Sequence, residues 1–178
     1  MSKIVFFSCM VIIFCFFSCK ENDKKVEQKK ARIFPEYTEA LDDIIRTKEG
    51  VIRGIDLNSK AFLISKTETK EASEVAHDYL YFEYVIDSVT NYSVSYTLQK
   101  DSLDEVEIQI NCSNLDMTAR IFDDLKTYYE KKLPNPTEDK GFVVYNCFEG
   151  QRKPFVVSLT DNSTPNKGII NLLIYKDK

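Results

Sequence analysis

Hydrophobic and polar positions alternate most regularly in two neighbouring segments near the middle of the chain. Every second residue from Tyr92 to Leu98 is apolar, and the residues between them are polar. The same alternation runs from Val106 to Cys112. Because successive side chains of a strand point to opposite faces of a sheet, this pattern predicts two strands with one buried and one solvated face each. The polar residues 100–102 between them predict a turn, so we expect the strands to form an antiparallel hairpin.

Apolar residues recur with helical spacing in two other segments, over about 36–48 and about 115–132. Pro35 precedes the first segment and Gly50 follows it, which are residues typical of the start and the end of a helix. Pro134 and Pro136 follow the second segment and cannot continue a helix. We therefore expect two amphipathic helices.

Shorter apolar runs complete the pattern. A brief helix is expected near 60–66, capped by Asn58 or Ser59, and the other strands are expected at 51–56, 79–86, 141–148, 154–160 and 168–176. Apart from the short strand at 51–56 and the brief helix, the order is one long helix and then three strands, twice over. Short connections favour antiparallel pairing, and two helices can cover only one face of a sheet. The sequence predicts a two-layer α+β domain over residues 33–178, with about six strands and possible tandem αβββ units.

The N-terminal segment differs from the rest of the chain. Lys3 is followed by a run over 4–18 that is apolar apart from two serines, and the sequence becomes sharply polar after Cys19. The run is shorter than the roughly 20 apolar residues that a membrane-spanning helix needs. One positive charge, a short apolar core and a small residue at its end are typical of a secretory signal. We expect residues 1–18 to be a signal peptide.

The end of that run, Phe16-Phe17-Ser18-Cys19, resembles the lipobox of bacterial lipoproteins. The resemblance implies that Cys19 is acylated and becomes the mature N-terminus, which anchors the protein to a membrane. In such lipoproteins an aspartate after the cysteine favours the inner membrane, so Lys20 implies sorting to the outer membrane. Residues 20–23 resemble lysine-and-acid signals for export to the cell surface, but charges that merely keep a tether soluble explain them equally well. A location on the periplasmic side of the outer membrane and a location on the cell surface therefore both remain as alternatives.

Charge divides the rest of the chain into a tether and a domain. Residues 20–32 are rich in lysine and contain no aromatic residue, so we expect 19–32 to be a disordered tether that carries the acylated cysteine. Residues 33–178 contain 17 basic and 25 acidic residues, a net charge of −8. Nucleic acids and anionic membrane surfaces attract basic proteins, so we expect neither as a partner of the domain.

The element order over residues 36–176 also resembles the tandem helix-plus-strands architecture of β-lactamase inhibitor proteins and of small outer-membrane lipoproteins built from one such unit. Residues 53–60 are similar to the glycine-containing strand that precedes a capped helix in those proteins. The resemblance implies the same α+β architecture and makes an inhibitor or toxin-neutralising role one alternative.

Residues that carry catalytic chemistry are sparse. His77 is the single histidine, and no spacing of cysteine and histidine predicts a metal site. The acids at 42–43, 104–105 and 123–124 are adjacent in sequence, so the side chains of each pair point in different directions and do not converge as a catalytic pair would. We interpret all three pairs as solvated. We expect no enzyme, no cofactor and no metal. Cys112 and Cys147 either form a disulfide, which an oxidising envelope permits, or are two buried thiols.

One candidate binding surface emerges from the strand at 79–86, which is apolar on both alternating faces except at Glu83. The sheet face that the helices do not cover must be exposed to solvent, covered by tails or loops, or bound by a partner. We expect Tyr79 and Tyr81 to contact a partner, with Tyr145 or Tyr175 from the second half of the domain. The alternative is a central strand that is covered on both faces.

The function predicted from the sequence is thus an outer-membrane lipoprotein with a non-enzymatic module that binds an envelope or extracellular partner, for which we expect a protein of the envelope. A toxin-neutralising or enzyme-inhibiting lipoprotein and a hydrolase of envelope polymers are the alternatives.

Overall fold

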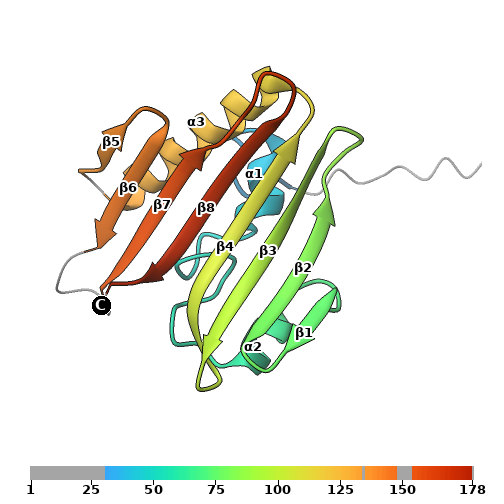
Figure 1. Cartoon of the computed structure of the whole chain (residues 1–178), viewed down its shortest axis with the longest axis vertical. Coiled ribbons are helices and arrows are strands. Elements are labelled where there is room, and N and C mark those ends of the chain that lie inside the picture. Colours follow the sequence, from blue (N-terminus) through green and yellow to red (C-terminus); the bar gives the residue numbers. More distant parts are fainter. Residues whose placement is uncertain (1–30, 134, 148–153, 178) are drawn as a thin grey trace, which may run out of the picture. The chain divides into compact units, whose positions relative to one another are not determined.

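In the part of the chain that the structure describes, eight antiparallel strands form one open sheet, with three helices packed beside it (Figure 1). The computed structural model describes residues 31–133, 135–147 and 154–177. The strands within these residues are β1 (Glu74–Ala76), β2 (Tyr79–Val85), β3 (Thr90–Gln99), β4 (Ser102–Cys112), β5 (Thr137–Asp139), β6 (Phe142–Cys147), β7 (Phe155–Asp161) and β8 (Gly168–Lys176). Their order across the sheet is β1-β2-β3-β4-β8-β7-β6-β5. The predicted α+β class with an antiparallel sheet is confirmed.

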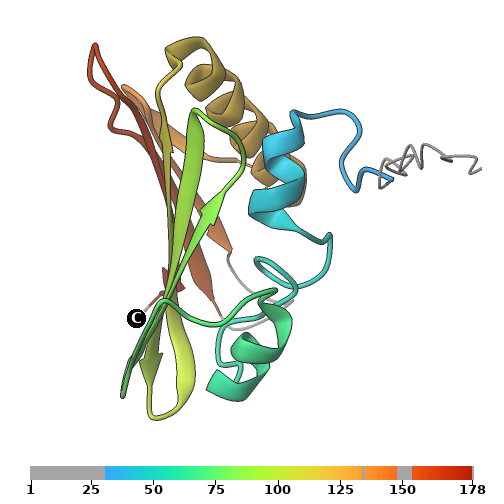
Figure 2. The same ribbon diagram turned by 90° about the vertical axis from the view of Figure 1, so that its right-hand side faces the viewer.

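The three helices are α1 (Glu39–Ile45), α2 (Ala61–Thr67) and α3 (Leu115–Lys132). Figure 2, which views the sheet from its edge, shows all three on the same side. The long helix α3 has the bounds that the sequence predicts, because Asn114 caps it by accepting a hydrogen bond from the Met117 amide. Its Ile121 and Leu125 are fully buried. None of the helices in the described part of the chain combines the length and the apolar character needed to cross a membrane.

Alternation along the strands divides the side chains between a helix-covered face and an open face. The helix-covered face holds the core, for example Val94, Val106 and Leu172, which are all buried. The open face holds the polar partners of the predicted hairpin and their neighbours in register. The hairpin turns at Lys100 and Asp101, which both have positive φ, as a two-residue turn between twisted strands requires.

The number of elements differs from the prediction. The sequence predicts about six strands, whereas the described residues form eight. The three helices are the two main helices and the brief helix that the sequence predicts near 60–66, which is α2. The two additional strands, β1 and β5, have three exposed residues each and are too short to show periodicity. The first predicted helix, 36–48, is shortened to Glu39–Ile45 because Arg46 adopts a left-handed conformation with φ of 65°.

The strand predicted at 51–56 is wrong. Ile52 and Ile55 instead close a tight turn, with the Ile55 amide 2.8 Å from the Ile52 carbonyl oxygen. Arg53 and Gly54 occupy the turn with positive φ values of 52° and 79°. The apolar residues of this segment are buried because the turn packs against the core.

Of the two alternatives for the cysteines, the disulfide is wrong, because Cys112 and Cys147 are both free. Cys112 lies opposite Gly168, at the start of β8. Cys147 lies opposite Phe155 of β7, which in turn lies opposite Lys176 at the end of β8. Two sites separated by eight strand residues along the sheet are roughly 25 Å apart, far beyond the reach of a disulfide.

Several predictions fall on the N-terminal segment. The signal peptide over 1–18, Cys19, Lys20 and the tether up to residue 30 lie outside the described residues. The last tether residue, Arg32, belongs to the folded part: its Nε donates to Asp42 Oδ2 at 2.7 Å, and its Nη2 donates to three backbone carbonyl oxygens. The predicted boundary of the domain therefore moves toward the N-terminus by at least one residue.

Candidate functional site

Three of the four tyrosines predicted to bind a partner lie on the open face. Tyr79 and Tyr81 are half-buried on β2, because the residues that alternate with them, Leu80 and Phe82, enter the core. Tyr175 on β8 lies in the same row across the sheet as Tyr79, through Thr97 of β3 and Glu105 of β4. The alternative, a strand covered on both faces, is not what the described residues show: no described segment lies over this face (Figure 2).

Tyr145 is the exception, and its predicted exposure is wrong. It faces the helices, is fully buried, and donates a hydrogen bond from its hydroxyl to the Lys126 carbonyl oxygen of α3 at 3.0 Å. Its neighbour Asn146 takes the open face in its place.

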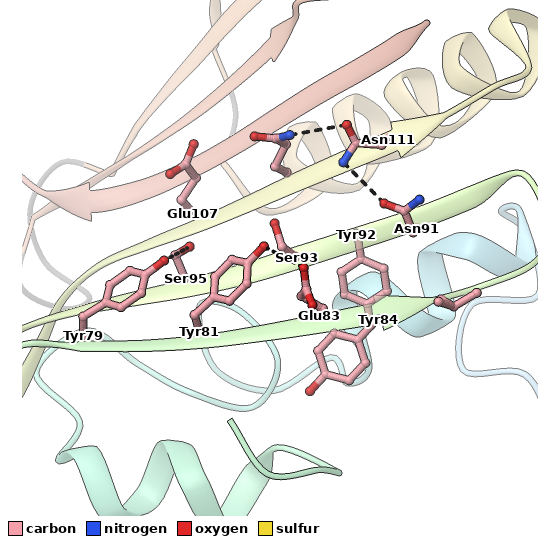
Figure 3. Close-up of a pocket in the computed structure, with 12 residues that line it drawn as sticks. Tyr79, Tyr81, Glu83, Tyr84, Asn91, Tyr92, Ser93, Ser95, Glu107 and Asn111 are labelled. Carbon is pink, nitrogen blue, oxygen red and sulfur yellow. Dashed lines mark hydrogen bonds between the residues drawn. The ribbon is translucent and has the colours of Figure 1, made fainter. Parts of the chain in front are cut away.

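The Tyr79 and Tyr81 rings lie side by side over β3 (Figure 3). Their centroids are 6.2 Å apart and their planes differ by 13°. The Tyr79 hydroxyl lies 3.2 Å from Ser95 Oγ, and the Tyr81 hydroxyl donates to Glu83 Oε1 at 3.3 Å. These contacts hold both rings in place in the absence of a partner, which lowers the entropy cost of binding.

A depression of about 580 Å³ lies over β2, β3 and β4, beside the two rings. Apart from the tyrosines and Val85, the residues that line it are polar: Glu83, Asn91, Ser93, Ser95, Glu107, Gln109 and Asn111. A chain of amide hydrogen bonds crosses the strands, from Gln109 Nε2 to Asn111 Oδ1 and from Asn111 Nδ2 to Asn91 Oδ1 (Figure 3). A second depression of about 490 Å³ shares these three amides. The two depressions together make the open face a shaped, polar surface with an aromatic edge.

The strand positions of this face carry charge of a single sign, whereas Lys167, in the loop before β8, lines the second depression. Among the strand positions in register on the open side, the described residues include five carboxylates: Glu74, Glu83, Glu105, Glu107 and Asp139. No lysine or arginine occupies any of these open-face positions in the described strands. The face is therefore more acidic than the domain as a whole.

The residues considered for catalysis do not converge. His77 lies in the exposed two-residue turn between β1 and β2. Of the adjacent acids on α3, Asp123 is exposed, and Asp124 accepts a hydrogen bond from the Thr38 amide at 2.7 Å. Within residues 31–133, 135–147 and 154–177, no group of three or more histidine, cysteine or acidic side chains is arranged to hold a metal ion.

A buried ion pair that the sequence pattern did not predict lies on the helix-covered side of the sheet. Arg53, in the turn before α2, and Glu68, at the end of α2, have 2% and 7% of their surface exposed. Arg53 Nε and Nη2 donate to the two carboxylate oxygens of Glu68 at 2.9 and 2.8 Å. Nothing in the local pattern couples two residues 15 positions apart, although an arginine within an apolar turn was a signal that its charge needed a partner.

The groups around this pair satisfy its remaining hydrogen bonds. The hydroxyls of Tyr84 and Tyr96, and Arg46 Nη1 at 2.6 Å, all donate to Glu68. Burial by itself would raise the pKa of Glu68, but the hydrogen bonds and charge of Arg53, together with the two tyrosine hydroxyls, lower it below its ordinary value. Burial and the neighbouring carboxylate raise the pKa values of Tyr84 and Tyr96, so both hydroxyls stay protonated and donate. We interpret this cluster as structural, since it fastens α2 to β2 and β3.

The open face thus combines paired aromatic rings, polar groups and two depressions, and the buried pair supports it from behind. A further depression of about 890 Å³ lies off this face, beside the end of α3 and residues 48–56. Comparison of the chain with protein-family models, with curated proteins and with solved structures finds no match.

Proposed function

We propose that this chain is an outer-membrane-anchored lipoprotein whose α+β domain binds a protein of the bacterial envelope without catalysing a reaction. The observation that supports it most is the open face of the sheet, where half-buried Tyr79 and Tyr81 line a polar depression and half-buried Tyr175 lies in the same row as Tyr79. Tyrosine is enriched at protein interfaces because it offers a rigid apolar ring and a polar tip. The ordered rings and the amide chain form a preorganised docking surface for such a partner.

We further propose that the two halves of the domain are tandem units. The strand order supports this proposal: β4 and β8, the last strands of each half, pair at the centre, and the shortest strands, β1 and β5, form the two edges. Such a mirrored arrangement gives one continuous open face with contributions from both units. A secreted toxin or enzyme docked on this face would make the protein an inhibitor, and identifying the partner distinguishes that role from envelope assembly.

Tyr81→Ala is expected to reduce capture of the partner about 30-fold, while the thermal stability of the protein changes little. An aromatic residue at the centre of an interface typically contributes about 2 kcal/mol or more to binding, which corresponds to this factor. The measurement is pulldown from crosslinked cells, quantified by mass spectrometry for each protein that the wild type enriches.

Phe62→Ala is the matched control, because Phe62 has 67% of its surface exposed and lies on α2, on the opposite side of the sheet. Its captured proteins should be those of the wild type. If Tyr81→Ala and Phe62→Ala capture the same proteins in the same amounts, the open face is not the docking surface. A stability loss of several kcal/mol in Tyr81→Ala would instead make Tyr81 a core residue.

Cys19→Ala is expected to abolish acylation and to leave an unprocessed or soluble protein, because one thiol carries the whole attachment to the membrane. Metabolic labelling with a fatty acid, followed by separation of membrane and soluble fractions, measures both effects. Cys15→Ala is the matched control and should leave labelling unchanged. Label retained by Cys19→Ala would contradict the assignment as a lipoprotein.

A further inference from the structure

Beyond the location of the docking face, its chemistry restricts what can occupy it. Glu107 is half-buried at the centre of the open face and lines the depression. Its neighbours in register are Ser95 on β3 and Leu173 on β8, and Glu105 and Gln109 flank it along β4 on the same face. No cation stands at any of these positions. Within the described sheet, this carboxylate therefore has no positively charged neighbour on its own face.

A second carboxylate stands on the far side of the same depression. Glu83 on β2 also lines it and accepts a hydrogen bond from the Tyr81 hydroxyl at 3.3 Å. The Tyr81 ring lies between the two acids, since its row across the sheet runs through Ser95 to Glu107 (Figure 3). Two carboxylates and an aromatic ring around one depression form a site for a positive group, because both attract cations.

The remaining polar groups near the depression favour the same type of ligand. The amide side chains of Asn91, Gln109 and Asn111 also line the depression, and each has a carbonyl oxygen that accepts hydrogen bonds. Arginine and lysine side chains carry donors and no acceptor, so they match a site that is rich in acceptors.

We propose that the depression over β2, β3 and β4 binds an arginine or lysine side chain of a protein partner, and that the partner presents a basic surface to the open face. The inference rests on the proposed function, because it names the chemistry of the partner that docks there. It follows from the charge complementarity of a face that carries five carboxylates and no basic residue in the described strands. A neutral glycan would stack on the same rings but would leave Glu107 without a counter-charge.

The test uses the full mature protein in detergent micelles and a fluorescent decapeptide of alternating arginine and serine as the probe. We expect saturable binding that weakens as salt is raised from low to physiological concentration, because screening acts on exposed charges. Glu107→Gln should weaken binding about tenfold, and Glu107→Lys should abolish it. Glu107→Gln is isosteric and should leave the unfolding temperature unchanged. Glu71→Gln, at an exposed acid outside the sheet, is the matched control and should bind as the wild type does.

The proposal is overturned if the peptide does not bind saturably, or if wild type and Glu107→Gln bind it equally. Equal binding of a glutamate–serine peptide would also overturn it. Pulldown from crosslinked cells separates this failure from failure of the proposed function. If Tyr81→Ala loses the captured protein and Glu107→Lys keeps it, the open face is the docking surface, but the partner is not held by a basic group and instead presents a neutral protein surface.

Discussion

Glu68→Gln is expected to lower the free energy of unfolding by about 3–5 kcal/mol, because it leaves Arg53 charged and buried without a counter-ion. Glu68 accepts hydrogen bonds from two nitrogens of Arg53. The same carboxylate also accepts hydrogen bonds from Arg46 and from the hydroxyls of Tyr84 and Tyr96. The amide that this substitution introduces would keep the shape of the side chain and lose the charge. Urea denaturation followed by circular dichroism measures the change.

Two further variants distinguish a lost ion pair from a general sensitivity of this region. Glu71→Gln changes an exposed glutamate three residues away and should alter stability by no more than about 0.5 kcal/mol. Arg53→Met combined with Glu68→Leu removes both charges and should be more stable than Glu68→Gln alone, because the dominant cost is a buried charge without its partner. A double variant that is less stable than the single one would contradict this account.

The same carboxylate makes stability depend on pH in a defined direction. The pKa of Glu68 is lowered in the folded protein, so the folded state binds its proton less readily than the unfolded state does. Its contribution to stability is fully present above the ordinary glutamate pKa of about 4.5 and is lost as the pH falls through the lower folded value. Between pH 7 and pH 3, the stability of the wild type should therefore fall more than that of Glu68→Gln.

Periodicity predicted the elements whose two faces differ in polarity. The hairpin of β3 and β4 and the helix α3 belong to this class, and their predicted positions are confirmed. The prediction of a strand at 51–56 was wrong because the apolar residues Val51, Ile52 and Ile55 indicate only that the segment is buried. A turn that packs on the core is buried just as a strand is. Here the adjacent Arg53 and Gly54 carried the turn signal.

The candidate site was predictable as far as local sequence determines which way a side chain points. Leu80 and Phe82 are the more apolar set of β2, which leaves Tyr79 and Tyr81 on the open face. For β6 the two alternating sets are both apolar, and only Asn146 indicated that Tyr145 points inward. The depression lies over β2, β3 and β4, which follow one another in the sequence. The continuation of the open face into the second half of the domain depends on the pairing of β4 with β8, a contact between residues far apart in the sequence. Periodicity carries no information about such a pairing.

Gly168→Ala is expected to destabilise the protein by about 3 kcal/mol or more. This is the upper end of the range that is usual for a methyl group inserted into a well-packed core. Gly168 begins β8 directly beneath α3, and a Cβ placed there would lie 1.9 Å from Thr118 Oγ1 and 2.7 Å from Thr118 Cβ. Thr118 has 2% of its surface exposed and its hydroxyl donates to the Asn114 carbonyl oxygen, so it cannot turn away. Thermal and urea unfolding measure the loss.

The compensating change shows whether the contact between α3 and β8 is the cause. Thr118→Gly removes all three atoms that the new methyl group would meet, so the double variant should lose less stability than the sum of the single variants. Gly141→Ala is the matched control: a Cβ there meets Asp161 only at ordinary contact distance, and the positive φ of 81° alone costs about 1–2 kcal/mol. If the losses in Gly168→Ala and Thr118→Gly simply add, α3 does not pack on Gly168 as closely as the structure indicates. An additive result would also weaken the assignment of faces, because this contact helps to place α3 on the side opposite Tyr79 and Tyr81.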